Sequence, residues 1–319
     1  MNGVWNGRYL SRPGKSQSGV ALITALLVVA IVTVIATSMA TRQQLDIRRS
    51  GNVLEHDQAY MFALGVESWG RSILIQDRRE NAVDNLSEPW ATVLPPLSVE
   101  GGKVAGHIED MQGRFNINNL VKEDKPSAMD VQRFERLLKQ LELNPSLSQA
   151  VIDWIDSDSE KISTDGAEDD EYLGHTPPYR TANNMINSIS ELRLINGFTK
   201  EAIERLSPFI TALPTYTHIN INTAPAEILM VLADGITKSD ADGMIEDRGT
   251  KGYADIQKFI TSPTIKSRNI PADGLGISSD YFLVDAASLF GKGQVRLLCL
   301  IHRTADNKAQ TLIRAQGVY

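Results

Sequence analysis

The chain has 319 residues, of which 42% are hydrophobic, and its formal net charge is −7. This length predicts about two folded units beyond any anchor segment. The acidic balance argues against sequence-independent binding of nucleic acid, which depends on Lys and Arg, and leaves room for a cation. The single cysteine, Cys299, excludes an intramolecular disulfide and a thiolate metal cluster. Its apolar surroundings (VRLLCLI) favour a buried, inert thiol.

The first element is an uncharged apolar run from Ser16 to Thr41. About 20 apolar residues cross a bilayer as a helix, so the run predicts one membrane span. A cleaved secretory signal has an apolar core of about 7–15 residues, and this run is too long for one. A plain signal anchor remains an alternative. Lys and Arg flank both ends of the run, so their distribution does not set the orientation.

The run is entered through a short basic leader that closes with Gly19 and is followed by Val20. This pattern resembles the class III signal of type IV pilins and pseudopilins. The resemblance implies that a prepilin peptidase cuts between Gly19 and Val20 and that the new amine of Val20 is methylated. It also places the C-terminal bulk outside the cytoplasm, in the periplasm. The leader carries three basic residues and no acid, so the remaining chain would have a net charge of −10.

Position five after the cut is Thr24, where most pilins and pseudopilins have Glu. A carboxylate in hydrocarbon is costly unless it is paired. In the family it is thought to be neutralised by the N-terminal amine of a neighbouring subunit. A subunit at the tip has no such neighbour, so the missing Glu fits a tip subunit. In this respect the chain resembles the general secretion pathway protein K family of minor pseudopilins in type II secretion.

Residues 41–76 lack proline, and their apolar residues recur at mostly helical spacing. They predict a stalk helix continuous with the membrane span, although a separate juxtamembrane helix is the alternative. Residues 86–101 contain three prolines and predict a loop. Two short extended runs within 103–118, on either side of Gln112-Gly113, predict a β-hairpin.

The pattern then becomes helical and finally returns to strands. Six helices are predicted, over 127–141, 146–155, 190–195, 200–206, 224–233 and 239–247. Three closing strands are predicted as an antiparallel meander, over 281–290, 294–303 and 308–316. The fold class is therefore α+β, with a pilin-like antiparallel sheet interrupted by an inserted all-α domain. The expected divisions are a leader (1–19), a transmembrane helix (20–40), a stalk with the first strands (41–125), the insertion (126–262) and the closing meander (263–319).

The densest ionisable segment runs from Asp153 to Glu171 (DWIDSDSEKISTDGAEDDE), where Lys161 is the one base among nine carboxylates. Many carboxylates without nearby cysteine suit Ca²⁺, which accepts 6–8 oxygen ligands in flexible geometry. The segment is no EF-hand, because Lys161 and Ala167 occupy the positions that require Gly and Glu. A solvated acidic loop is the alternative.

The same segment resembles the calcium-binding insertion of the K-family pseudopilins. The resemblance implies a calcium ligand set of four carboxylates, Asp156, Asp158, Glu168 and Asp169. Weaker candidates for the same site are Asp153, Asp165, Asp170 and Glu171. A catalytic role for these acids is disfavoured because they crowd into a loop, and the five histidines show no metal or triad spacing. The chain is not expected to be an enzyme.

Residues 220–260 resemble a helix-hairpin-helix (SAM-like) unit with its hairpin at Gly235-Ile236. Such hairpins can meet a phosphate when Lys or Arg stands nearby. Here acidic residues surround the hairpin and Lys238 is the nearby base. A protein-packing role is therefore favoured, and no nucleic-acid partner is expected.

Taken with the resemblance, the sequence predicts a minor pseudopilin that caps a periplasmic pseudopilus and helps to start its assembly for protein export. Its location would be the bacterial inner membrane, with a single span. The implied partners are other minor pseudopilins in a tip complex, the major pseudopilin, the prepilin peptidase, the inner-membrane assembly platform, and either secretin or cargo. Two alternatives remain: a minor pilin of a type IV pilus or competence system, and a membrane-anchored helix-hairpin-helix protein that binds DNA.

Overall fold

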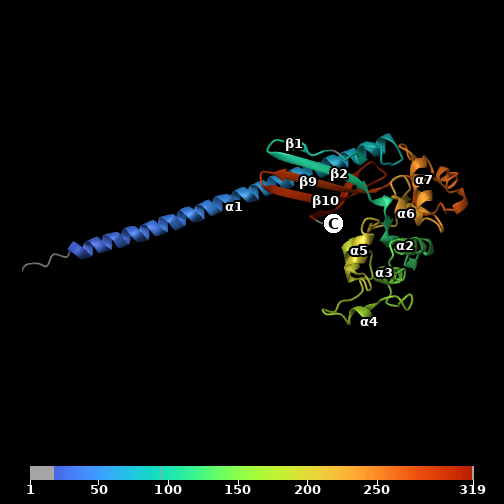
Figure 1. Ribbon diagram of the computed structural model, residues 1–319, viewed down its shortest axis with the longest axis horizontal. Helices are drawn as coiled ribbons and strands as arrows, with labels where there is room; N and C mark the ends of the chain where they lie inside the picture. Colours follow the sequence, from blue (N-terminus) through green and yellow to red (C-terminus); the bar gives the residue numbers. More distant parts are fainter. Residues whose placement is uncertain (1–17, 94, 318–319) are drawn as a thin grey trace, which may run out of the picture. The chain divides into compact units, whose positions relative to one another are not determined.

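The computed structural model describes residues 18–93 and 95–317 (Figure 1). The chain divides at Glu55 into two units, which are considered separately here. Helix α1 (Ser18–Glu80) runs without interruption from the first unit into the second, as predicted for a continuous stalk. Most of the leader, residues 1–17, lies outside the described part of the chain.

The first unit consists of the N-terminal part of α1, whose apolar side chains are exposed; for example, Ile23 and Val34 are 67% and 69% exposed. This part of α1 is long and apolar enough to span a membrane. Threonine hydroxyls along it donate to backbone carbonyls one turn earlier, so they need no partner from outside the helix. The segment therefore fits an apolar solvent.

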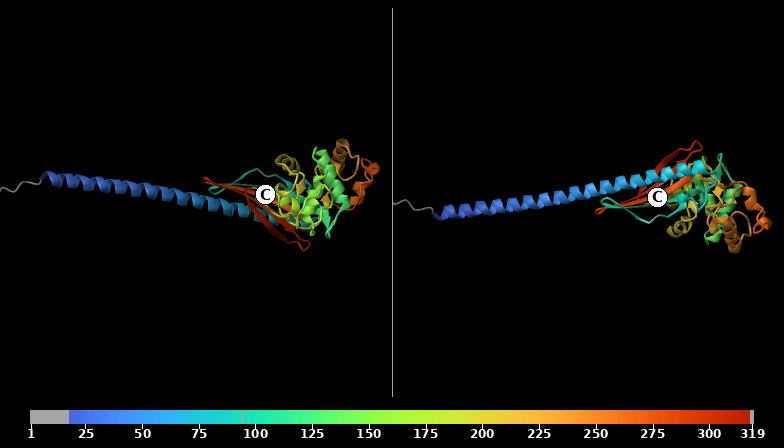
Figure 2. Two further views of the ribbon diagram at one scale, coloured as in Figure 1. Left: turned by 90° about the horizontal axis from the view of Figure 1, so that it is seen from below. Right: turned by 90° about the horizontal axis from the view of Figure 1, so that it is seen from above.

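The second unit contains a five-stranded antiparallel sheet in the order β1-β2-β9-β10-β11. Its teal and red strands lie beside the C-terminal part of α1 in both views of Figure 2. The strands are β1 (Leu97–Val99), β2 (Gly102–Asp110), β9 (Tyr281–Phe290), β10 (Gly293–Arg303) and β11 (Ala309–Gln316). The predicted closing meander is thus confirmed as β9, β10 and β11, with His302 opposite Tyr281 and Arg303 opposite Ala309.

The C-terminal part of α1 packs on one face of this sheet. Alternation along β10 places Leu297, Cys299 and Ile301 on that face, where they join Ala63 and Leu74 of α1 in one buried cluster. Glycines allow close approach at this contact. A Cβ on Gly106 would lie 2.5 Å from a methyl carbon of Val66. Strand β2 and helix α1 are therefore too close at Gly106 for any larger residue there.

The predicted hairpin around Gln112-Gly113 is wrong. Strand β2 ends at Asp110 and a 3₁₀ turn, Met111–Gly113, follows it. The chain then leaves the sheet, because β3 (Phe115–Asn116) pairs in parallel with β6 (Ile210–Thr211). The true hairpin joins β1 to β2 through Gly101, whose φ of 82° favours glycine. Strand β1 was expected to be loop.

The remaining elements form a mainly helical body between β2 and β9. Its α-helices are α2 (Ala128–Gln140), α3 (Leu147–Ile155), α4 (Asp169–Tyr172), α5 (Lys200–Leu206), α6 (Ala226–Met230), α7 (Lys238–Arg248) and α8 (Ile256–Ile260). Its 3₁₀ helices are η3 (Ile117–Leu120), η4 (Ile189–Leu194) and η5 (Lys266–Arg268), and η1 (Pro89–Ala91) and η2 (Met111–Gly113) precede it. Its short strands include β4 (Val121–Lys122), β5 (Lys125–Pro126), β7 (Ile219–Asn220) and β8 (Leu275–Gly276).

Most of the predicted helices are present in the helical body. The exceptions are 190–195, which is a 3₁₀ helix, and 224–233, of which α6 covers only the centre. Its buried core extends from Phe115 to Leu275. That extent is wider than the predicted insertion at 126–262, because segments on either side of it complete the core. Leu213 of this body and Leu300, on the second face of the sheet, belong to one buried cluster.

Candidate functional site

The predicted processing site lies at the beginning of α1. Gly19 and Val20 are both in the first turn of the helix, so a cut between them would leave the helix almost whole. The Thr24 hydroxyl donates to the carbonyls of Val20 and Ala21, each at 3.0 Å. The hydrogen-bonding capacity of the Thr24 hydroxyl is therefore met within its own helix, whereas a carboxylate at this position would need a cation.

The acidic segment is anchored by the end of α3 and the beginning of α4. One carboxylate oxygen from each of Asp156, Asp158 and Glu168 lies within 4.8 Å of the other two. Asp156 directly follows α3 and Glu168 directly precedes α4, and both are buried, whereas Asp158 is exposed. We call these three residues the loop cluster. The structure thus brings together three of the four ligands implied by the resemblance.

The loop cluster contains buried oxygens without a hydrogen-bond partner. They include Asp156 Oδ1 and Glu168 Oε1, and Asp153 Oδ2 beside the cluster is a third. The second oxygen of Asp153 accepts from the Ile162 amide at 3.0 Å, and that of Glu168 accepts from the Thr181 hydroxyl at 2.9 Å. Buried polar atoms are normally paired. A hard cation held by the loop cluster would give the carboxylates of Asp156 and Glu168 a common partner.

The electrostatics of the loop cluster agree with this geometry. Burial and the neighbouring Asp158, Asp153 and Glu168 raise the pKa of Asp156 to about 7. Burial is also the largest cause that raises the pKa values of Glu168 and Asp153. These carboxylates raise one another's pKa values, and Lys161, the base of the segment, forms its ion pair with Asp170 at 3.0 Å.

The structure does not bring Asp169 into the loop cluster. Its carboxylate accepts from Arg180 Nη1 at 2.6 Å and from the Thr181 amide at 3.1 Å. Of the weaker candidates, Asp170 pairs with Lys161 as described, while Asp165 and Glu171 are exposed. Only Asp153 among the weaker candidates has a buried oxygen without a partner in the described part of the chain.

Asn183 is a neighbour of the loop cluster that the sequence analysis missed. Its side-chain amide donates to the Asp158 carbonyl at 2.6 Å, and its Oδ1 is buried without a partner. Its φ is 45°, in the left-handed region that Asn tolerates. An amide residue so far along the chain gives no periodic or charge signal, so only the fold could identify it.

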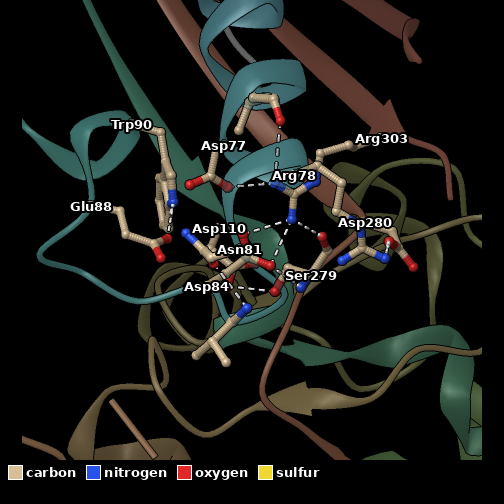
Figure 3. Close-up of polar contacts among 12 residues, drawn as sticks. Asp77, Arg78, Asn81, Asp84, Glu88, Trp90, Asp110, Ser279, Asp280 and Arg303 are labelled. Atoms are coloured by element: carbon tan, nitrogen blue, oxygen red, sulfur yellow. Dashed lines mark hydrogen bonds and ion pairs between the residues drawn. The ribbon is translucent and has the colours of Figure 1, made fainter. Parts of the chain in front are cut away.

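A second group of buried carboxylates surrounds Arg303 at the end of β10 (Figure 3). Arg303 is fully buried, and its Nη1 donates to Asp77 at 2.7 Å. Its Nη2 donates to both oxygens of Asp84 at 2.6 Å and to the Ser279 carbonyl at 2.7 Å. The guanidinium also lies over the Phe282 ring, 4.7 Å from its centroid. We call Arg303, Asp77, Asp84 and Glu88 the arginine cluster.

The arginine cluster continues into the helical body through Asp110. One oxygen of Asp110 accepts from Thr223, Ser279 and Asn220, at 2.6, 2.7 and 2.9 Å, and its other oxygen accepts from the Gln112 amide. Burial raises the pKa of Asp110 to about 6. Burial, followed by the nearby Glu88, raises the pKa of Asp77 to about 7.

The basic residues near the Gly235 turn are engaged within the protein. Arg248 Nη1 donates to the carbonyls of Ile221 and Ala224, at 3.2 and 2.8 Å, and burial lowers its pKa. Lys238 lies 3.4 Å from Asp242 and 3.9 Å from Glu227. Arg248 is thus directed into the protein, whereas Lys238 forms ion pairs at the surface.

Comparison with known proteins places this architecture in a defined class. The family described as "Type II secretion system (T2SS), protein K" matches in two parts, at residues 113–215 and 219–278. The chain is 35% identical to type II secretion system protein K of Pseudomonas aeruginosa, covering 95% of this chain and 94% of that one. It is 33% identical to the protein of the same name from Aeromonas hydrophila, with 95% and 98% covered.

A solved structure has the same fold: a chain in the GspK-GspI-GspJ complex from the type 2 secretion system of enterotoxigenic Escherichia coli. It superimposes with a TM-score of 0.77 at 24% identity, covering 85% of this chain and all of that one. The apolar N-terminal helix, the antiparallel sheet and the helical body thus belong to a chain whose relatives are named as components of type II secretion. The chain belongs to the type II secretion system protein K family.

Proposed function

We propose that this protein is the minor pseudopilin that caps the tip of a periplasmic pseudopilus and helps to start its assembly. The observation that carries the proposal is family membership along 95% of the chain, together with Thr24 at the position where a carboxylate would need a partner. The apolar part of α1 is the single-pass anchor in the inner membrane. The helical body lies in the periplasm and blocks the addition of a subunit above it.

The proposed partners follow from this role. Other minor pseudopilins form the tip complex, as suggested by the complex in which the related structure was solved. The major pseudopilin, the prepilin peptidase and the assembly platform act on the same helix, and the helical body faces the secretin or the cargo. The proposed divisions of the chain are the leader, the span, the stalk, the insertion and the closing meander. The insertion includes all residues of the core that extends from Phe115 to Leu275.

The turn between α6 and α7 is proposed to be a helix-hairpin-helix (SAM-like) module used for packing within the chain. Gly235, with φ of 72°, makes the turn, and Thr237 and Asp240 form a capping box at the beginning of α7. The inward hydrogen bonds of Arg248 support packing over nucleic-acid binding.

A secretion assay tests the tip role at Thr24. In a strain that lacks the native gene, Thr24→Glu is expected to secrete less than the wild type, because a tip subunit has no neighbouring amine to pair with the carboxylate. The control, Thr24→Val, is expected to secrete normally, since the hydroxyl contacts only its own helix. Normal secretion by Thr24→Glu at equal protein level would contradict the tip assignment.

We further propose that the loop cluster holds a structural Ca²⁺, with Asp156, Asp158 and Glu168 as carboxylate ligands. The support is the pair of unpartnered buried oxygens on Asp156 and Glu168 and an all-oxygen donor set, which suits calcium. The ion would neutralise the loop and fix the end of α3 against the beginning of α4. Asp169 is left out of this set because of its ion pair with Arg180.

Terbium luminescence tests this site in the full-length protein in detergent. The Trp154 and Tyr172 rings lie within the two elements that hold the cluster, 5.3 Å apart, and can sensitise a bound lanthanide. We expect saturable terbium emission that calcium displaces, lost in Asp156→Asn and kept in the control Asp169→Asn. Emission that persists in Asp156→Asn would contradict the assignment.

A further inference from the structure

The arginine cluster lies where the sheet and the helical body meet. Asp77 belongs to α1, Asp84 to the loop that follows, and Arg303 to the end of β10. From there the hydrogen bonds pass through Ser279 to Asp110 and to two residues of the helical body, Asn220 and Thr223. The Asp84 carbonyl also accepts from Asn220 directly, at 3.2 Å. Breaking this network would release the helical body from the sheet.

The charges in this network do not balance. Four carboxylates take part, on Asp77, Asp84, Glu88 and Asp110, and the guanidinium inside the network is that of Arg303. The nearby Arg78 is directed to Asp280, 3.7 Å away (Figure 3). Glu88, which is half-buried, accepts from the Trp90 indole at 2.7 Å and from Asn85, both of which are neutral donors.

Two of these carboxyl groups approach each other closely. One oxygen from each of Asp77, Asp84 and Glu88 lies within 4.8 Å of the others, and Arg303 donates to both Asp77 and Asp84. Two ionised carboxylates this close together repel each other when they are buried, and a proton on one of them removes that repulsion. Asp84 accepts two bonds from Arg303 and one from the Ser279 backbone amide, at 2.7 Å, whereas Asp77 accepts one from Arg303, so Asp77 has the freer carboxyl group to hold a proton.

We propose that Asp77 and Asp84 share one proton, and that this proton makes the docking of the helical body on the sheet sensitive to pH. When the proton is present, Asp77 donates to Asp84 and the single guanidinium balances the pair. When it leaves, two buried anions face each other beside Glu88 and Asp110. Water then enters the junction, and the contacts of Ser279, Asn220 and Thr223 open more often.

The direction of the effect follows from linkage. Burial holds the pKa of Asp77 at about 7 in the closed junction, above its ordinary value of about 3.9 in an open one. The closed state therefore binds the proton more tightly. Its stabilising contribution is complete at low pH and is lost as the pH rises toward 7.

Hydrogen exchange tests the proposal in the full-length protein in detergent, between pH 6 and 8, after correction for the intrinsic pH dependence of exchange. Amides at 219–223 and 277–281 are expected to exchange faster as the pH rises, by up to about tenfold per unit below pH 7, and to level off above it. Asp110 titrates near the lower end of this range, so its effect is confined to the most acidic samples.

The decisive variant is Asp77→Asn, which keeps the shape and the donor of the protonated form. It is expected to flatten the pH dependence and to protect these amides at pH 8 better than the wild type does. The matched control Asp285→Asn, at the Arg296 pair of β9 and β10, should keep the wild-type slope. The proposal would be overturned if exchange in the wild type did not depend on pH and if Asp77→Asn were less protected at every pH. That result would show that Asp77 is a permanently charged partner of Arg303.

Discussion

The loop cluster and the arginine cluster are built from the same residue types and are stabilised in different ways. Each brings at least three carboxylates within 4.8 Å of one another. In the arginine cluster a guanidinium from β10 enters the group and donates to two of its members. In the loop cluster the nearby bases are directed elsewhere, Lys161 to Asp170 and Arg180 to Asp169.

The difference indicates that a cluster of carboxylates needs an external cation when the fold places no basic side chain inside it. A buried anion must be paired or protonated, since desolvation disfavours its charged form. The arginine cluster contains its own cation and can be complete as the chain folds. The loop cluster retains unpartnered oxygens on Asp156 and Glu168, so we expect it to depend on calcium.

The largest effect is expected from removing the internal cation. Arg303→Met should lower the free energy of unfolding by about 3–5 kcal/mol, because it leaves Asp77 and Asp84 buried without their partner. Urea denaturation measures the change. The control Arg296→Met removes a guanidinium whose side chain is 57% exposed, and should cost less than about 1 kcal/mol. Equal losses in the two variants would remove the distinction between the clusters.

The next effect concerns calcium removal. A ligand present at about 100 times its dissociation constant stabilises the folded state by about 2.7 kcal/mol. Chelation is therefore expected to lower the melting temperature of the wild type. It should leave Asp156→Asn unchanged and should affect Asp77→Asn as much as the wild type. A chelator effect that Asp156→Asn retains would locate the ion elsewhere.

The third prediction is a pH dependence at the junction. Asp77 and Asp110 have pKa values of about 7 and about 6, above their ordinary range. The folded state thus holds protons that the unfolded state has lost, and stability should fall as the pH rises from about 4 to 7. Melting curves of the wild type and of Asp77→Asn in the same buffers measure it. The variant should be less sensitive to pH between 6 and 7, and an identical slope would contradict this prediction.

The smallest effect is expected at Asp169. Its partner Arg180 is 73% exposed, so Asp169→Asn should change stability by less than about 1 kcal/mol. The variant should also bind calcium with wild-type affinity. A large loss of calcium affinity in Asp169→Asn would return Asp169 to the ligand set.

Local patterns in the sequence predicted much of the fold. Within residues 281–316, apolar and polar residues alternate in three runs that are separated by turn residues, and these runs form the meander. The prediction succeeded because both signals come from residues that are close together in the sequence. The uncharged run and the absence of proline predicted the continuous helix α1. The prediction of a hairpin at Gln112 was wrong because local alternation does not reveal which strand is the partner. Phe115 pairs with Ile210, which is far away in the sequence.

The two clusters show the same limit. The loop cluster was found because Asp156, Asp158 and Glu168 lie within one acidic segment. Asn183 was missed because it lies outside that segment. Arg303 pairs with Asp77 across 226 residues, and no feature of its surroundings in the sequence distinguishes it from an exposed arginine at the end of a strand. Contacts between residues that are distant in the sequence can be identified only from the three-dimensional structure.

The loop cluster, and not the arginine cluster, is proposed to depend on an external cation. Calorimetric titration of calcium into the full-length protein in detergent tests this proposal most directly, with the wild type compared with Asp156→Asn and Asp77→Asn. We expect saturable binding in the wild type and in Asp77→Asn, and none in Asp156→Asn. Binding that Asp77→Asn abolishes, or that Asp156→Asn retains, would contradict the proposal.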